Sequence, residues 1–184
     1  MAENMLDQVY FFKVQTPLGD LPALASDHFI YYLGYREEDA RIFAAAHRLG
    51  LVYAASPLTA PLNRELEEYF AGQRTRFSLP IKPLGTPFQR QVWQALRDIP
   101  YGHTASYQAI AQAIGRPQAS RAVGGANHRN PLSIIIPCHR VIRADGSLGG
   151  YGGGLAAKKY LLNLEQAGLE GSLAKPPEKG YDKS

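Results

Sequence analysis

The residues of this sequence best suited to covalent chemistry lie in one stretch, residues 133–142, which reads Ser-Ile-Ile-Ile-Pro-Cys-His-Arg-Val-Ile. Cys138 is the only cysteine among the 184 residues, so no disulfide can form within the chain. The apolar, β-branched run before Pro137 predicts a buried strand or extended segment that holds the thiol still. Cys138 is therefore a candidate nucleophile. The competing interpretation is a buried structural cysteine, which most free cysteines are.

A thiol attacks as the thiolate, and a free pKa of about 8.5 leaves only a small fraction ionised at neutral pH. His139 can take the proton. Because neighbouring side chains of an extended segment point to opposite sides, we expect a bridging water molecule between them. The histidine also needs an acid that fixes its tautomer, and Glu165 is slightly favoured over Asp98 and Asp145.

The elements that must position this stretch lie in residues 86–170. Thr86, Pro87 and Gln89 form a capping-box pattern, which predicts a helix that ends near residues 99–100. A further helix, residues 155–166, closes the region, and residues 171–184 are expected to be a disordered tail.

Between these helices, residues 106–114 and 118–127 predict two short helices around a Gly-Arg-Pro break, a helix-turn-helix pattern. Ser106 is the expected N-cap of the first of them. The Asp-Gly pair in residues 144–147 predicts a hairpin turn between a strand and a short strand, which gives a winged-helix order. The second helix is almost all Ala, Gly and Ser around Arg121. Such a smooth helix suits insertion into a nucleic-acid groove, and it equally suits tight helix packing.

Residues 149–154 contain five glycines and no phosphate-loop lysine, which favours a lid or a row of backbone N–H donors over a plain linker. Residues 1–76 predict a separate small α/β domain, and the proline-containing residues 77–85 predict the linker. The expected fold class is therefore α+β.

The elements expected in the first domain are a small β-meander of three strands, followed by a helix, a strand and a second helix. Asn63 is the predicted N-cap of its second helix, and Gly72 the predicted stop. No catalytic constellation is evident there. The expected strands are residues 9–14, 21–25, 28–35 and 51–55, and the expected helices are residues 37–49 and 63–71.

Composition excludes several classes of protein. The five histidines lack metal-ligand spacing and no Cys-x-x-Cys pair exists, so neither a metal nor a cofactor is expected. No membrane span or signal peptide is evident, which together with the free thiol predicts a cytoplasmic location. The chain carries a net charge of +4, and residues 86–170 hold nine Lys or Arg against four Asp or Glu. This balance suits a polyanionic partner, although an ordinary basic surface explains it equally well.

Taken together, these blocks resemble the O6-alkylguanine-DNA alkyltransferases, also called methylated-DNA–protein-cysteine methyltransferases. The resemblance is strong over residues 86–166 and weak over residues 1–85. It is carried by Pro137-Cys138-His139-Arg140-Val141, Thr86-Pro87-Phe88-Gln89, Ser106-Tyr107, residues 121–126, Asn130-Pro131 and Tyr151 with Gly153-Gly154. Two departures are Asn127, where an apolar residue is common, and Gly152, where some members carry serine or alanine.

The resemblance implies a ribonuclease H-like N-terminal domain, a C-terminal winged helix-turn-helix domain and a suicide repair reaction. In that reaction, O6-alkylguanine, and by extension O4-alkylthymine, is flipped out of duplex DNA and its alkyl group moves irreversibly to Cys138. His139, a water and Glu165 would activate the thiol. Tyr107 would bond the flipped base and protonate the leaving guanine. The helix would enter the minor groove, with DNA contacts from Ser120, Arg121, Ala122, Gly124 and Tyr107, and Arg121 would fill the gap in the base stack.

The base pocket implied by the resemblance consists of Asn130, Val141, Tyr151 and Gly152. The carbonyls of Cys138 and Val141 would accept from the guanine amino group, and the N–H of Gly152 would donate to O6. A monomer is expected, with cooperative binding along DNA left open. Two other hypotheses remain: a non-enzymatic winged-helix protein that binds DNA lesions, and a cysteine hydrolase that turns over.

Overall fold

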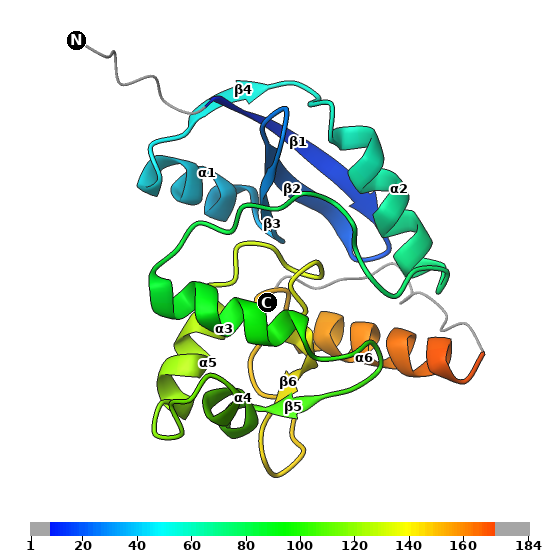
Figure 1. Cartoon of the computed structure of the whole chain (residues 1–184). Helices are drawn as coiled ribbons and strands as arrows, with labels where there is room; N and C mark the ends of the chain where they lie inside the picture. Colours follow the sequence, from blue (N-terminus) through cyan, green and yellow to red (C-terminus); the bar gives the residue numbers. More distant parts are fainter. Residues whose placement is uncertain (1–7, 172–184) are drawn as a thin grey trace.

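The protein is described by a computed structural model that covers residues 8–171 (Figure 1). Its N-terminal half is built on a four-stranded sheet of order β3-β2-β1-β4. The strands β1 (Gln8–Thr16), β2 (Gly19–Ala25) and β3 (Ile30–Leu33) form an antiparallel meander. The strand β4 (Gly50–Tyr53) lies parallel to β1. The predicted strands and the α+β class are confirmed.

Alternating side chains of β1 face opposite layers, as the two-residue period of a strand requires. Val9 and Phe11 pack with the helix α1 (Glu37–Ala46), while Val14 belongs to the larger core on the other face. The helix α2 (Thr59–Phe70) covers that second face (Figure 1). The sheet therefore lies between α1 on one side and α2, with the rest of the molecule, on the other.

The prediction that Asn63 caps the second helix is wrong, because α2 begins one turn earlier. Two side-chain hydrogen bonds stabilise this start. Thr59 Oγ1 accepts from the N–H of Ser56 at 2.9 Å, and Ser56 Oγ accepts from the N–H of Leu58 at 3.0 Å. Pro61 is tolerated in the first turn, where its missing N–H would have no helical partner. Gly72, with a φ of 73°, follows the end of the helix as predicted.

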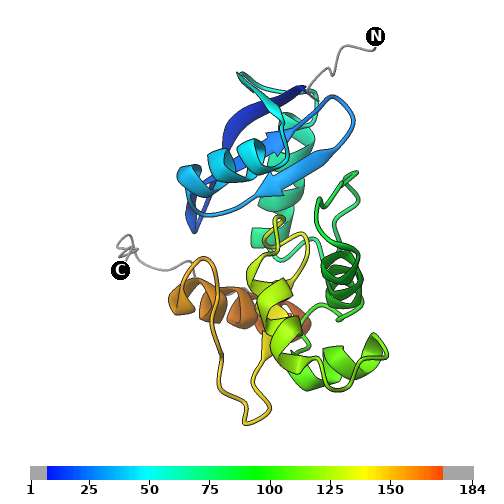
Figure 2. The same ribbon diagram turned by 90° about the vertical axis from the view of Figure 1, so that its left-hand side faces the viewer.

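The C-terminal half consists of short helices around a two-stranded parallel sheet of β5 (Ala105–Ser106) and β6 (Val141–Ile142). Its helices are α3 (Pro87–Arg97), α4 (Tyr107–Ala113), α5 (Ser120–His128) and α6 (Leu155–Leu169). The predicted capping box of α3 and the Ser106 cap of α4 are both present. Figure 2 shows α4 at the end of the molecule away from the N-terminal sheet, with α5 extending from there toward the N-terminal half.

The predicted wing differs from the structure. The Asp-Gly turn forms, with the N–H of Arg143 donating to the Ser147 carbonyl at 2.9 Å. However, residues 147–150 form no strand, and β6 pairs in parallel with β5 instead of with a hairpin partner. The wing is therefore a loop that projects below the β5–β6 pair (Figure 1).

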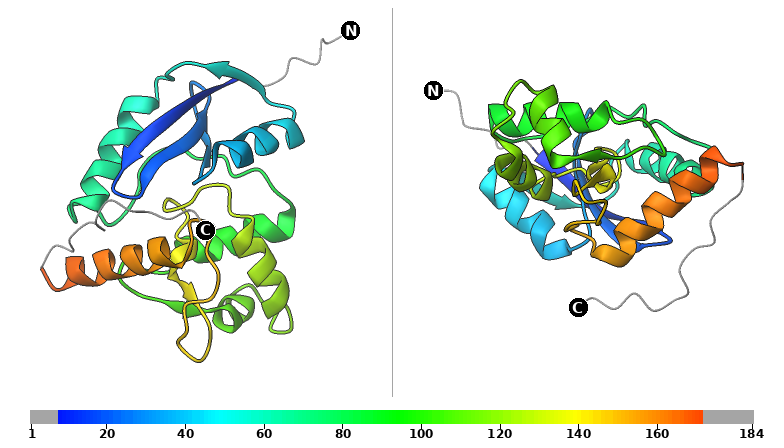
Figure 3. Two further views of the ribbon diagram at one scale, coloured as in Figure 1. Left: turned by 180° about the vertical axis from the view of Figure 1, so that it is seen from behind. Right: turned by 90° about the horizontal axis from the view of Figure 1, so that it is seen from below.

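The two halves share one core and several backbone hydrogen bonds. The N–H of Leu33 donates to the Pro131 carbonyl and that of Ser133 to the Leu33 carbonyl, both at 2.9 Å. The segment predicted as a linker is fastened as well, because Ile30 bonds through its backbone to Pro80 and Lys82. Figure 3 shows α6 lying under the end of α2. Within residues 8–171, no helix is both long enough and apolar enough to span a bilayer. The predicted tail lies almost wholly outside the described residues.

Candidate active site

Cys138 is presented by a buried loop and not by the extended segment that the sequence predicted. Residues 138–140 form a 3₁₀ helix, η1 (Cys138–Arg140), and the apolar run before it turns back on itself. Ile134 adopts a left-handed φ of 71°, which is uncommon for a β-branched residue and costs about 1–3 kcal/mol. The premise that Cys138 and His139 point to opposite sides of a strand is therefore wrong.

Asn130 and the N-terminal sheet hold this loop in place. The Asn130 amide donates to the Ile136 carbonyl at 2.8 Å, and its oxygen accepts from the N–H of Leu132 at 3.0 Å. The backbone bonds to Leu33 fix the same segment from the other side. These contacts hold the strained turn at Ile134, which lies four residues before Cys138 in the chain.

The Cys138 side chain is only 5% exposed, and burial raises the pKa of its thiol. A hydrogen bond from Asn130 and the charge of Lys158 act in the opposite direction and lower that pKa. The thiol is therefore mostly protonated at neutral pH, and an attack requires a base.

His139 and Glu165 are both fully buried, with His139 Nε2 2.7 Å from Glu165 Oε1. Burial alone would raise the pKa of Glu165, but the hydrogen bond from His139 and the adjacent Arg140 outweigh it and hold the pKa well below its usual range. Burial lowers the pKa of His139, and the nearby Arg140 lowers it as well. The hydrogen bond to Glu165 acts in the opposite direction and raises that pKa. Burial is the largest of these effects, so the neutral imidazole is favoured at neutral pH.

The neutral state assigns the tautomer of His139. An ionised carboxylate only accepts, so Nε2 carries the proton and donates it to Glu165. Nδ1 is then a bare acceptor, and it is one of three buried side-chain atoms in the described part of the chain without a protein partner. The histidine is thus arranged to receive one proton at Nδ1. Of the three acids considered from sequence, only Glu165 bonds to it; Asp145 bonds to Ser147 in the wing, and Gln94 lies 3.5 Å from Asp98.

Two further residues surround the Glu165 carboxylate and were not predicted as site residues. Tyr69, fully buried on α2, donates its hydroxyl proton to Oε1 at 2.7 Å. The N–H of Gly102 donates to Oε2 at 3.1 Å. The Arg140 guanidinium contacts both carboxylate oxygens at 2.9 Å and the Ile99 carbonyl at 2.7 Å. Tyr69 shares a helical face with Leu62 and Leu66, but nothing in the sequence indicates a partner 96 residues away.

Lys158 is a third residue that sequence reasoning missed. Its buried ammonium donates to the carbonyls of Val141 at 2.6 Å, Gly150 at 3.3 Å and Leu148. Burial lowers its pKa to about 8, while the nearby Cys138 raises it. The sequence does contain a signal for Lys158: this charged residue lies on the otherwise apolar face of α6, seven residues before Glu165.

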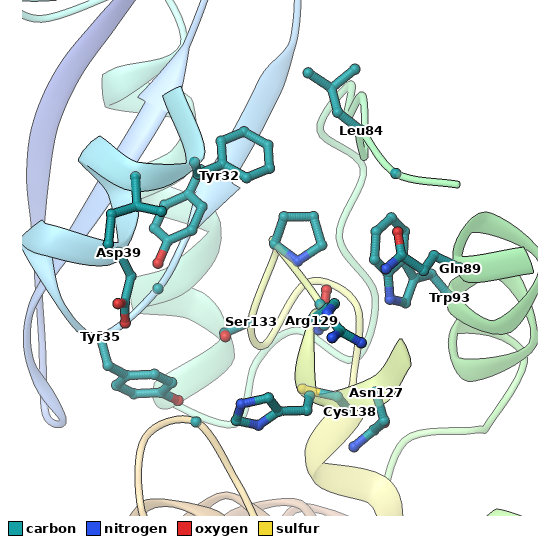
Figure 4. A pocket seen from close by; sticks show the side chains of 18 of the residues that line it. Tyr32, Tyr35, Asp39, Leu84, Gln89, Trp93, Asn127, Arg129, Ser133 and Cys138 are labelled. Atoms are coloured by element: carbon teal, nitrogen blue, oxygen red, sulfur yellow. The ribbon is translucent and has the colours of Figure 1, made fainter. Parts of the chain in front are cut away.

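A cavity of about 1320 Å³ opens between the two halves, with Cys138 in its wall (Figure 4). The predicted pocket residues Asn130, Tyr151 and Gly152 line it, as does Tyr107. Val141 is instead fully buried in β6, where its carbonyl accepts from Lys158. The N-terminal half also contributes to the lining, which the sequence did not predict. The lining includes Tyr32 of β3, Tyr35 in the segment that follows it, and Phe43 with other residues of α1.

Among the predicted DNA-contact residues, Arg121 and Ala122 on α5 are exposed, and Ser120 and Gly124 are half-buried. Arg121 and Gly124 share one face of the helix, while Val123, Ala126 and Asn127 face the interior. A Cβ at Gly124 would be 3.8 Å from the Tyr107 ring, and one at Gly125 would be 3.5 Å from Arg129. Both are ordinary van der Waals contacts, so tight packing within the chain does not require these glycines.

Within residues 8–171, no group of three His, Cys, Asp or Glu residues lies close enough to bind a metal ion. Asn127, the departure noted in the sequence, is buried, and its Oδ1 has no protein partner.

Comparison with known proteins gives matches to both halves. Residues 9–83 match the family described as 6-O-methylguanine DNA methyltransferase, ribonuclease-like domain, and residues 87–167 match its DNA binding domain. A methylated-DNA–protein-cysteine methyltransferase of Methanosarcina barkeri is 42% identical over 88% of this chain and 99% of its own length. A constitutive one from Bacillus subtilis is 44% identical over 85% and 95%. Among solved structures, Mycobacterium tuberculosis OGT in complex with DNA superposes with a TM-score of 0.77 at 41% identity, covering 87% of this chain and 94% of that one.

Proposed function

This chain belongs to the 6-O-methylguanine DNA methyltransferase family, and from this we propose that it repairs DNA by moving the alkyl group of O6-alkylguanine onto Cys138. The sulfur of Cys138 attacks the alkyl carbon, the S–C bond forms and the C–O6 bond breaks. The products are a thioether and an unmodified guanine. Because a thioether is not hydrolysed, each molecule reacts once.

The arrangement of Cys138, His139 and Glu165 supports this reaction most strongly. The thiol proton has an acceptor in Nδ1 of His139, reached through one water molecule, and Glu165 stabilises the imidazolium that results. Lys158 lowers the pKa of the thiol and favours the developing thiolate. No cofactor enters this scheme.

The base is held by groups that line the cavity. We place the guanine between Tyr151 and the residues of η1, with the N–H of Gly152 toward O6. Tyr107 lines the cavity and supplies the proton that the leaving guanine requires. Burial raises the pKa of its phenol, so the proton stays on Tyr107 until negative charge develops on the guanine. The carbonyls of Cys138 and Val141 accept from the guanine amino group. The Val141 carbonyl also accepts from Lys158, and it can serve both donors because a carbonyl oxygen has two acceptor sites.

DNA binding is assigned to α5. Its Gly124 and Gly125 are not required by packing within the chain, which favours their use in close approach to a groove. We propose that α5 enters the minor groove, with Ser120, Arg121 and Ala122 in contact and the Arg121 side chain in the gap left by the flipped base. We also propose that the protein is a monomer, that it accepts O4-alkylthymine as well, and that it acts in the cytoplasm.

A titration tests the proposed function. Increasing amounts of protein are incubated with a duplex that contains one O6-methylguanine, and the remaining lesion is measured by chromatography of the DNA hydrolysate. One lesion should disappear per molecule of protein, with no further loss on longer incubation. Binding without loss of the lesion would favour a lesion-binding protein, and loss beyond one per molecule would favour an enzyme that turns over.

A further inference from the structure

Tyr35 lies where the N-terminal half meets the residues that close the cavity. It follows β3 by two residues, and Leu33 at the end of β3 is fixed by backbone hydrogen bonds to Pro131 and Ser133. Those two residues immediately precede the loop of Cys138. The position of Tyr35 relative to the thiol is therefore set by backbone contacts and not by a flexible surface segment.

The Tyr35 side chain contacts the glycine-rich loop (residues 149–154). Its hydroxyl lies 2.6 Å from the hydroxyl of Tyr151, and the two rings meet edge to face with centroids 5.6 Å apart. The Tyr151 ring in turn meets the His139 ring edge to face at 6.5 Å. Figure 4 shows Tyr35 in the cavity wall on the side of the N-terminal half. The rings of Tyr35, Tyr151 and His139 thus form a chain of contacts from the N-terminal half to His139, the proposed proton acceptor of Cys138.

Gly153 gives a second, independent sign that Tyr35 shapes this loop. A Cβ at Gly153 would lie 2.6–2.7 Å from three atoms of the Tyr35 ring, closer than real contacts allow. The backbone of Gly153 is not left-handed, so the contact with Tyr35, and not the backbone conformation, favours a glycine there. A Cβ at Gly150, in the same loop, would meet open space.

We propose that Tyr35 is a positioning residue for alkyl transfer and that it restricts the size of the alkyl group. It holds Tyr151 over the cavity and seats the glycine-rich loop against its own ring. The substituent on the attacked carbon lies beside the sulfur and must find room in the same cavity, so a loop held close favours methyl over larger groups. This inference rests on the proposed function, and it gives the N-terminal half a part in substrate selection.

The test compares Tyr35→Phe and Tyr35→Ala with wild-type protein and with Tyr53→Phe, an exposed tyrosine on β4. Transfer constants at saturating DNA are measured for duplexes with O6-methylguanine and O6-benzylguanine. Affinity is measured separately with each change placed on a Cys138→Ala background. Tyr35→Phe should slow methyl transfer about fivefold, the factor expected from one lost hydrogen bond, with affinity within about twofold of wild type. Tyr35→Ala should raise the benzyl-to-methyl ratio about threefold or more, and Tyr53→Phe should match wild type.

A second pair of variants covers the case in which Tyr35→Ala is poorly folded. Gly153→Ala should slow methyl transfer, and Gly153→Ala combined with Tyr35→Ala should be no slower than Tyr35→Ala alone. Two results would overturn this inference alone. One is a wild-type rate of methyl transfer and an unchanged benzyl-to-methyl ratio in the Tyr35 variants. The other is a slowing by Gly153→Ala that is as large in the double variant as in the wild-type background. Absence of transfer by the wild-type protein would overturn the proposed function itself.

Discussion

At the scale of single residues, the mechanism that we propose requires a neutral His139 beside an ionised Glu165. Burial and the charge of Arg140 both favour the neutral imidazole, and the two-point contact of Arg140 with Glu165 leaves the proton-accepting atom of the histidine free. Without Arg140, the carboxylate would raise the pKa of the histidine further and populate its charged form more.

Glu165→Gln should therefore lower the transfer rate about 100-fold or more, the lower end of what a general base contributes. It should also destabilise the fold by about 3–5 kcal/mol, because Arg140 loses its buried counter-ion. Single-turnover kinetics and urea unfolding measure the two effects. Glu170→Gln, at the exposed end of the same helix, is the matched control. A Glu165→Gln protein with near wild-type rate and stability would remove Glu165 from the mechanism.

The same carboxylate predicts a pH dependence of stability. The folded state holds the pKa of Glu165 well below its usual range, so below about pH 4.3 the unfolded chain binds more protons than the folded one. The free energy of unfolding should then decrease as the pH falls below that value. Thermal unfolding between pH 5 and pH 3 should show a decline in wild type that is shallower in Glu165→Gln. Parallel declines in the two proteins would contradict the assignment.

At the scale of elements, the glycines of α5 lower the stability of the helix and leave one of its faces smooth. Gly124 should therefore be replaceable in the fold but not in binding. Gly124→Ala is expected to raise the free energy of unfolding by about 0.5–1 kcal/mol, the difference in helix propensity. It should weaken binding to lesion-containing duplex about tenfold, measured on a Cys138→Ala background. Unaltered affinity would show that α5 does not approach DNA through this face.

Local patterns in the sequence predicted the regular elements well. The strands of the meander, the capping box at Thr86 and the Ser106 cap depend on neighbours within a few residues, and the structure contains all of them. The loop of Cys138 was predicted incorrectly, because its apolar run has strand-like composition. Its conformation is instead set by Asn130 and by Leu33, which lies about 100 residues earlier in the chain.

At the scale of the whole molecule, the N-terminal half is part of the active site. Sequence reasoning found no catalytic constellation there, because the residues concerned act across the boundary between the halves. Tyr69 reaches the Glu165 carboxylate, Tyr35 reaches Tyr151, and Leu33 holds the segment before Cys138. None of these partners could be assigned from spacing within either half.

Tyr69→Phe should accordingly cost about 1.5–3 kcal/mol of stability, the contribution of a hydrogen bond to a charged group. The change leaves the ring and its packing intact, so the loss reports on the hydroxyl alone. Urea unfolding of Tyr69→Phe beside Tyr53→Phe provides the measurement and its control. A loss below about 0.5 kcal/mol in Tyr69→Phe would mean that the contact between the halves does not stabilise Glu165.

The most direct test of the account is the mass of the protein after reaction. Incubation with a duplex that contains O6-methylguanine should add about 14 Da to every molecule, because a methyl group replaces the thiol hydrogen. Peptide mapping should place the gain on Cys138, and Cys138→Ser should gain nothing. An unchanged mass after complete binding, or a gain on any other residue, would contradict the conclusion that Cys138 is consumed in the repair reaction.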